Sequence, residues 1–231
     1  MPTNTSIPTL NGDGRIPAYV AEPATAPRAA IIVYQEVFGV NPGIARKADR
    51  FAEMGYLAVA PDAFWRLQPG IELDPDVPEQ LQRALGYMGR FDFDLAIRDV
   101  EAVIHWIRRE RAIGKVGFVG FCLGGRVAYL TATRTDIDAT VGYYGVMIDQ
   151  LLGEKHAIAK PLLLHIPTSD GFVSPEAQKA MHEGLDDHPK VTLIDYPGLD
   201  HGFASEFGKR RDDAAAKLAD ERTNAFFAQH L

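Results

Sequence analysis

The sequence predicts an α/β domain with a mostly parallel central sheet and helices on both faces. Short apolar runs rich in β-branched and aromatic residues alternate along the chain with longer amphipathic runs. Continuous apolar runs are typical of parallel strands that are covered on both faces. This alternation and the length of 231 residues together predict one domain over residues 1–231.

The individual elements follow from the two kinds of run. The apolar runs are interpreted as the strands Ala29–Tyr34, Tyr56–Ala60, Val116–Phe121, Ala139–Tyr144, Pro161–His165 and Val191–Tyr196. The amphipathic runs are interpreted as the helices Pro42–Met54, Asp94–Arg111, Leu123–Arg134, Pro175–Leu185 and Arg211–His230. The segment Trp65–Gly89, which is rich in proline and glycine, is interpreted as a loop with a short helix, either a lid or a plain surface connection. In such sheets ligands bind beyond the carboxyl ends of the strands, so the site residues are expected there.

The composition restricts the partners and the compartment. A net charge of −7 argues against binding to nucleic acid or to an anionic membrane surface. No run approaches the roughly 20 apolar residues of a membrane helix, and Met1–Leu10 lacks the features of a signal peptide. Cys122 is the only cysteine, which excludes an intramolecular disulfide and any metal site built from several cysteines. We therefore expect a cytoplasmic protein without a metal or an organic cofactor.

Cys122 stands in a pattern that is typical of a nucleophile. The run Gly120-Phe121-Cys122-Leu123-Gly124 lies between a predicted strand and a predicted helix, as in the G-x-nucleophile-x-G turn of α/β-hydrolases, with cysteine in place of serine. The turn places the sulfur at a helix N-terminus, where the dipole favours the thiolate. It also directs the Leu123 N–H toward the developing oxyanion. The alternative is a buried structural cysteine beside ordinary loop glycines.

The acid and the base of such a site follow the nucleophile in that chain order. Asp170 comes shortly after the predicted strand Pro161–His165, and His201 comes shortly after Val191–Tyr196. Asp170 could instead be a turn residue of an Asp-Gly pair, but three compatible residues at successive loop positions favour a triad. His201 would accept the thiol proton and later protonate the leaving alkoxide, while Asp170 would fix the imidazole tautomer.

Further motifs make nearly the whole chain similar to the dienelactone hydrolase family. Besides the residues around Cys122, Asp170 and His201, they are Tyr34–Asn41, Gly55-Tyr56, Ala60–Asp62, Val141–Val146 and Glu221–Thr223. The resemblance implies an α/β-hydrolase fold and hydrolysis of a cyclic enol lactone. It also implies that Glu36 helps to activate the thiol when substrate binds, and that the Val37 N–H is an oxyanion donor beside that of Leu123.

Two positions depart from that family pattern. The resemblance implies two arginines that hold the substrate carboxylate, but the corresponding positions are Leu81 and Ser205. Each lost hydrogen bond to a charged group is worth about 1.5–3 kcal/mol. We therefore expect the small-molecule substrate to be a neutral ester or lactone. The residues expected to line its pocket are Phe38, Leu81, Tyr144, Phe172, Phe203 and Ser205.

Three alternatives remain open. The first is a true dienelactone hydrolase (carboxymethylenebutenolidase), in which Arg83 or Arg66 replaces the missing arginines. The second is a hydrolase whose thiolate also attacks phosphotriesters. The third, from another class, is a non-catalytic binding protein or thiol sensor on the same fold. The oligomeric state is left open.

Overall fold

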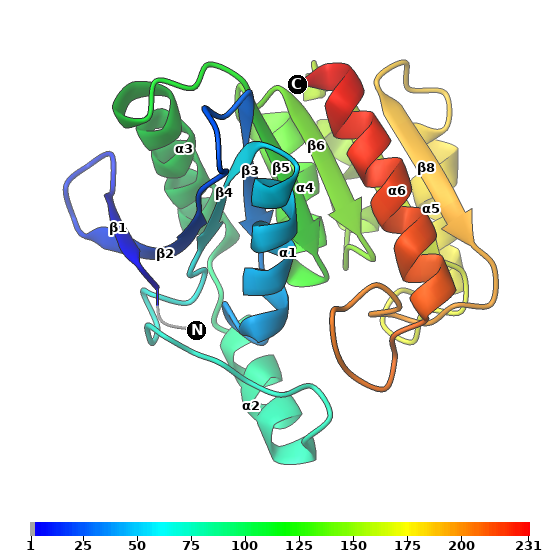
Figure 1. The fold of residues 1–231 in the computed structure, drawn as a ribbon. Coiled ribbons are helices and arrows are strands. Elements are labelled where there is room, and N and C mark those ends of the chain that lie inside the picture. Colours follow the sequence, from blue (N-terminus) through cyan, green and yellow to red (C-terminus); the bar gives the residue numbers. More distant parts are fainter. Residues whose placement is uncertain (1–2) are drawn as a thin grey trace. The chain divides into compact units, whose positions relative to one another are not determined.

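The structure, a computed structural model, describes residues 3–231 (Figure 1). The backbone forms two compact units, Met1–Gly117 and Phe118–Leu231. Residues 1–2, where the predicted domain and the segment Met1–Leu10 begin, lie outside the described residues. One domain over residues 1–231 stays a prediction.

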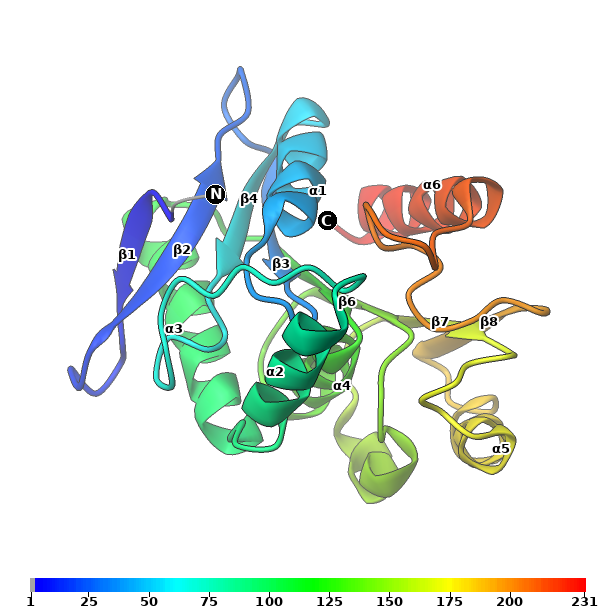
Figure 2. The same ribbon diagram turned by 90° about the horizontal axis from the view of Figure 1, so that it is seen from below.

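The first unit combines antiparallel and parallel strands with three helices. Its elements are β1 (Thr5–Pro8), β2 (Arg15–Ala21), β3 (Ala29–Tyr34), α1 (Pro42–Glu53), β4 (Tyr56–Pro61), α2 (Pro78–Met88) and α3 (Phe93–Glu110). The strand order is β1-β2-β4-β3, in which β3 and β4 are parallel and the other two pairs are antiparallel. Helix α1 lies on one face of these strands and α3 on the other, as Figure 2 shows.

The antiparallel strands β1 and β2 were not expected from the sequence. Pro17 lies inside β2, and proline cannot donate a hydrogen bond to a strand ladder. The structure accommodates it because Pro17 faces Ser6 of the short strand β1 and because its carbonyl accepts a hydrogen bond from the Asp62 N–H at 2.8 Å. The segment Trp65–Gly89 carries α2, which has eleven residues and begins with Pro78 in the first helical turn.

The second unit, together with the strand β5 that leads into it, is mostly parallel. Its elements are β5 (Val116–Phe121), α4 (Leu123–Arg134), β6 (Ala139–Tyr143), the 3₁₀-helix η1 (Asp149–Ala157), β7 (Leu162–Pro167), α5 (Pro175–Leu185), β8 (Val191–Tyr196) and α6 (Asp213–His230). The strand order is β5-β6-β7-β8, and β6, β7 and β8 are parallel to one another. Helices α4 and α5 cover one face of these strands and α6 covers the other (Figure 2).

The predicted α/β class, with a mostly parallel sheet and helices on both faces, is confirmed. The helices Leu123–Arg134 and Pro175–Leu185 and the strands Ala29–Tyr34, Val116–Phe121 and Val191–Tyr196 have the predicted bounds. Where other predicted ends differ, they are displaced by one or two residues. Tyr144 was placed in a strand, which is wrong: its φ of 38° lies in the left-handed region, and β6 ends at Tyr143. The 3₁₀-helix η1 was not expected.

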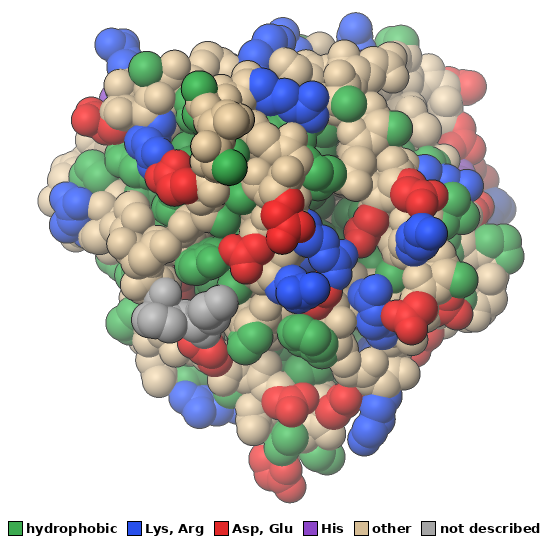
Figure 3. All heavy atoms as spheres, viewed as in Figure 1, with side chains coloured by type: hydrophobic (Ala, Val, Ile, Leu, Met, Phe, Trp, Pro, Cys, Tyr) green, Lys and Arg blue, Asp and Glu red, His purple; other side chains and the backbone are tan. Residues whose placement is uncertain are grey.

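The surface carries charges of both signs. On the face shown in Figure 3, lysine and arginine side chains are interspersed with aspartate and glutamate. Among residues 3–231, no helix combines the length and the apolar character needed to cross a membrane.

A buried polar network joins the strands β6, β7 and β8 to α6. The side chain of His165, on β7, bonds through Nδ1 to the Tyr196 hydroxyl at 2.8 Å and through Nε2 to the Thr223 hydroxyl at 3.0 Å. Thr223 also bonds to the Tyr143 hydroxyl at 2.6 Å, and that hydroxyl donates to Asp220 at 3.3 Å. Burial, with a smaller contribution from the charge of Arg222, lowers the pKa of His165 to about 3.

We expect the neutral His165 to make the protein sensitive to acid. The pKa of His165 in the folded protein lies below the ordinary 6.5. The stabilisation of the folded state by neutral His165 is therefore complete above pH 6.5 and is lost as the pH falls from 6.5 toward 3. The free energy of unfolding should fall over this range by up to about 1.4 kcal/mol per pH unit for this group. Urea titrations from pH 4.5 to 7.5 measure this slope. His165→Gln should reduce it, the exposed His156→Gln should not, and an unchanged slope in His165→Gln would contradict the assignment.

Candidate active site

Cys122 lies in a strained turn between β5 and α4. Its backbone has φ 56° and ψ −111°, outside the regions that ordinary residues adopt. A Cβ at position 120 would lie 1.9 Å from the carbonyl oxygen of Gly124, so glycine is required there. The Cys122 N–H donates to the Tyr143 carbonyl at 3.0 Å, and its own carbonyl accepts from the Gly125 N–H at 2.9 Å. These contacts hold the thiol at the start of α4.

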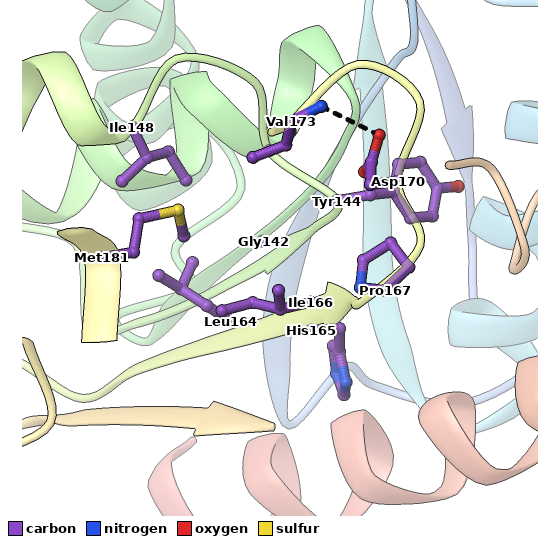
Figure 4. A pocket seen from close by; sticks show the side chains of 11 residues that line it. Gly142, Tyr144, Ile148, Leu164, His165, Ile166, Pro167, Asp170, Val173 and Met181 are labelled. Carbon is purple, nitrogen blue, oxygen red and sulfur yellow. Dashed lines mark hydrogen bonds between the residues drawn. The ribbon is translucent and has the colours of Figure 1, made fainter. Parts of the chain in front are cut away.

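Asp170 lies in the loop that follows β7. Its Oδ1 accepts hydrogen bonds from the backbone N–H groups of Phe172 at 2.7 Å and Val173 at 3.1 Å. Figure 4 shows the second of these bonds. The side chain is 1% exposed. Asp170 is therefore an oriented, buried acceptor and is more than a surface turn residue.

His201 lies after β8 and contacts Asp170 directly. Its Nδ1 is 2.9 Å from Oδ2 and 3.1 Å from Oδ1 of that carboxyl group. This geometry requires the proton on Nδ1, since a carboxylate can only accept. The rings of Tyr144 and Phe172 meet the imidazole edge to face, with centroids at 4.9 and 4.8 Å. The ring is thus fixed in place by its hydrogen bonding to both oxygens of Asp170 and by two aromatic contacts.

The electrostatic surroundings favour the charged form of His201. Burial by itself lowers the pKa of this ring, but the negative charge of Cys122 and the interaction with Asp170 outweigh it and raise the pKa from 6.5 to about 10. The buried Nε2 atom has no well-aligned hydrogen-bond partner among residues 3–231. The pKa of His201 thus depends on Cys122 as well as on Asp170.

The structure places Cys122, Asp170 and His201 in one compact unit, together with Leu123, the first residue of α4. The first helical residues have no intrahelical acceptor for their N–H groups. The Leu123 N–H is thereby suited to the role of oxyanion donor.

Glu36 and Val37 belong to the first unit, in the loop that follows β3. Glu36 is 8% exposed and Val37 is 3% exposed. The side chain of Gln35 shapes this loop, because its Nε2 donates to the Glu36 carbonyl at 3.2 Å and its Oε1 accepts from the Ala63 N–H at 3.0 Å. The roles of Glu36 in thiol activation and of Val37 in the oxyanion hole stay predictions.

The residues predicted to line a substrate pocket differ in exposure. Phe172 is 47% exposed, whereas Phe203 is fully buried against Tyr144 and Tyr196. Ser205 is half-buried, with its hydroxyl 3.4 Å from that of Tyr144. In the first unit, Phe38 is buried after β3 and Leu81 is half-buried on α2. Their contact with a substrate stays a prediction.

A small cavity of about 10 Å³ lies beside Asp170 and Tyr144 (Figure 4). Its far side consists of the apolar side chains of Ile148, Leu164 and Met181, while His165 points to the other side of β7. Residues 3–231 contain no group of three or more His, Cys, Asp or Glu side chains arranged to hold a metal ion. The expectation of a site without a cofactor stays a prediction.

Asp200 is a residue near the site that the sequence analysis did not single out. Its Oδ1 accepts from the backbone N–H groups of Gly171 at 2.8 Å and His201 at 2.7 Å. No sequence motif marks Asp200, because one of its two hydrogen-bond partners, Gly171, lies 29 residues away in the chain.

The fold and the chain order of Cys122, Asp170 and His201 are those of an α/β-hydrolase. The chain belongs to the dienelactone hydrolase family, whose sequence profile matches residues 16–231. It is accordingly a hydrolase that acts on ester bonds.

Three known proteins illustrate the similarity. A putative carboxymethylenebutenolidase of Azospirillum brasilense is 41% identical over 99% of both chains. The crystal structure of a putative dienelactone hydrolase from Klebsiella pneumoniae subsp. pneumoniae MGH 78578 has a TM-score of 0.82 at 26% identity and covers 98% of this chain and 100% of that one. The dienelactone hydrolase-like promiscuous phosphotriesterase P91 from metagenomic libraries has a TM-score of 0.76 at 21% identity, with 98% and 97% covered, and so shares the fold.

We expect His201 to remain an imidazolium at pH 8 in the wild-type protein. Its pKa should fall in Cys122→Ala, because the negative charge near the ring is lost. Ring chemical shifts of ¹³C-labelled histidine between pH 5 and 10.5 measure this. Titration of His201 near 6.5 in both proteins would contradict the expected effect of Cys122 on the pKa of His201.

The same pKa has a consequence for stability. Because the folded pKa of about 10 lies above the ordinary 6.5, the stabilisation from protonated His201 is complete below pH 6.5. It is lost as the pH rises toward 10. Cys122→Ser, which keeps the size of the side chain without a thiolate, should show a smaller loss over this range in urea titrations.

Proposed function

We propose that this chain hydrolyses neutral carboxylic esters or lactones with Cys122 as nucleophile, His201 as acid–base and Asp170 as the residue that orients His201. The observation that carries the proposal is the buried contact between His201 Nδ1 and Asp170 at 2.9 Å in a unit that also holds Cys122 in a strained turn. This arrangement fixes the proton on Nδ1 and leaves Nε2 for proton transfer.

The reaction proceeds in two halves. The Cys122 thiolate attacks the carbonyl carbon, and the N–H groups of Leu123 and Val37 stabilise the resulting oxyanion. When the carbon–oxygen bond breaks, the His201 imidazolium protonates the leaving alkoxide and a thioester remains. Neutral His201 then takes a proton from water, the hydroxide adds to the thioester, and the thiolate leaves with formation of the acid. Glu36 takes the role of activating the thiol when substrate binds.

The neutrality of the substrate is supported by the cations that are already engaged. Arg66 bonds to Asp99 at 2.8 Å and to Asp13 at 3.1 Å, so its charge is matched twice. Arg83 donates to the Tyr87 hydroxyl at 3.2 Å. Ser205, at the position where the family pattern implies an arginine, offers only a hydroxyl. Hydrolysis of dienelactone itself by means of Arg66 or Arg83 is therefore the less favoured alternative.

Attack on phosphotriesters is a second candidate. The similarity in fold to a protein described as a promiscuous phosphotriesterase favours testing it. A thiolate and an oxyanion hole serve an attack at phosphorus as well as at carbon.

A thiol sensor on the same fold is the alternative without catalysis. It would bind a ligand, or its thiol would be oxidised, without turnover of a substrate. Localisation in the cytoplasm rests on the single cysteine and also stays a proposal.

Removal of either reacting group should abolish turnover. We expect Cys122→Ala and His201→Ala to lower kcat for p-nitrophenyl acetate by about 10³-fold or more. The exposed His156→Ala should remain active, and chelator should not affect the wild type. Near-full activity in either site variant, or a folded wild type without turnover on esters, lactones or phosphotriesters, would contradict the proposal.

The preference for a neutral over an anionic substrate can be measured with one pair of substrates. The wild type should show a higher kcat/KM for the methyl ester of a lactone carboxylate than for the free anion. Ser205→Arg should raise kcat/KM for the anion by about tenfold, which corresponds to one charge-assisted hydrogen bond. The uncharged Ser205→Gln should not raise it. A wild-type preference for the anion would instead favour true dienelactone hydrolysis.

A further inference from the structure

The loops that carry Asp170 and His201 are bonded to each other through their backbones. The Thr168 N–H donates to the carbonyl of Tyr196 at 3.1 Å, and the Ser169 N–H donates to that of Leu199 at 2.9 Å. These bonds continue the pairing of β7 with β8 beyond the strand ends. They stop before the two residues of the candidate site.

One side chain bridges the loops at that point. The Asp200 Oδ1 atom accepts both the Gly171 N–H at 2.8 Å and the His201 N–H at 2.7 Å. Gly171 directly follows Asp170. A single oxygen therefore connects the backbone next to the acid with the backbone of the base.

We propose that Asp200 is a positioning residue that sets the separation of Asp170 and His201. The inference rests on the proposed function for its effect on turnover, but its structural effect is independent of that function. Both bonds are made to a carboxylate, and charge-assisted bonds to backbone N–H groups are short and strong.

The surrounding charges favour the ionised carboxylate. Burial acts to raise the pKa of Asp200, but the backbone hydrogen bonds from Gly171 and His201 and the positive charges of Arg210 and His201 outweigh it and lower the pKa. The guanidinium of Arg210 also lies over the Phe172 ring, 5.1 Å from its centroid. Phe172 in turn packs against the His201 imidazole. Asp200 and Arg210 thus support the base from its backbone and from its ring.

Loss of the bridge should impair chemistry more than binding. In Asp200→Ala we expect kcat to fall by about 10-fold to 100-fold with little change in KM, since a displacement of roughly 1 Å has this effect on a reacting group. Asp200→Asn keeps an oxygen acceptor of the same length and should recover most of kcat. The exposed Asp187→Ala, which removes an equal charge elsewhere, should behave as wild type.

The His201 ring resonances separate this proposal from the proposed function. They should shift and broaden in Asp200→Ala and return in Asp200→Asn, even if the wild type turns over none of the substrates. If Asp200→Ala does not fold, Asp200→Glu moves the oxygen and should lower kcat similarly. Two results would overturn the proposal. The first is a folded Asp200→Ala or Asp200→Glu variant with unchanged His201 resonances and a kcat within twofold of wild type. The second is an Asp200→Asn variant whose kcat is no higher than that of Asp200→Ala.

Discussion

The left-handed backbone of Cys122 is the constraint on which the candidate site depends. Such a conformation costs on the order of 1–3 kcal/mol in a residue other than glycine, so the surroundings must hold it. Here the Tyr143 carbonyl binds the Cys122 N–H, and the contact of Gly120 with Gly124 closes the turn. The thiol then lies at the N-terminus of α4. A relaxed turn would direct the side chain elsewhere.

The other two residues lie where short loops leave parallel strands, and they hold each other. Asp170 accepts two backbone N–H groups of its own loop and still reaches the imidazole of His201. Because both side chains are almost fully buried, water competes little for these bonds. The raised pKa of His201 is the electrostatic result, since the negative charge of Cys122 and the interaction with Asp170 outweigh the effect of burial. Positive charge on the imidazole is thus favoured despite burial.

Much of the second unit could be predicted from the sequence, because its strands are continuous apolar runs and its turns contain distinctive residues. Helix α4 and the turn at Cys122 are marked by glycines at required positions, and Asp170 and His201 follow clear strands. Strand β2 was missed because Pro17 argues against a strand unless its neighbour is known. Asp200 was missed because its two partners are backbone groups. A side chain that joins two loops through their backbone N–H groups leaves no recognisable pattern in a single sequence.

The polar network around His165 has a consequence for how the chain acquires its site during synthesis. Thr223, on α6, completes the hydrogen bonds of both His165 and Tyr143, and Tyr143 is the residue whose carbonyl holds Cys122. A nascent chain that lacks α6 would leave these buried hydroxyl and imidazole groups without their partner, which is unfavourable. The surroundings of the Cys122 turn are therefore complete only when Thr223, about a hundred residues further along the chain, is in place.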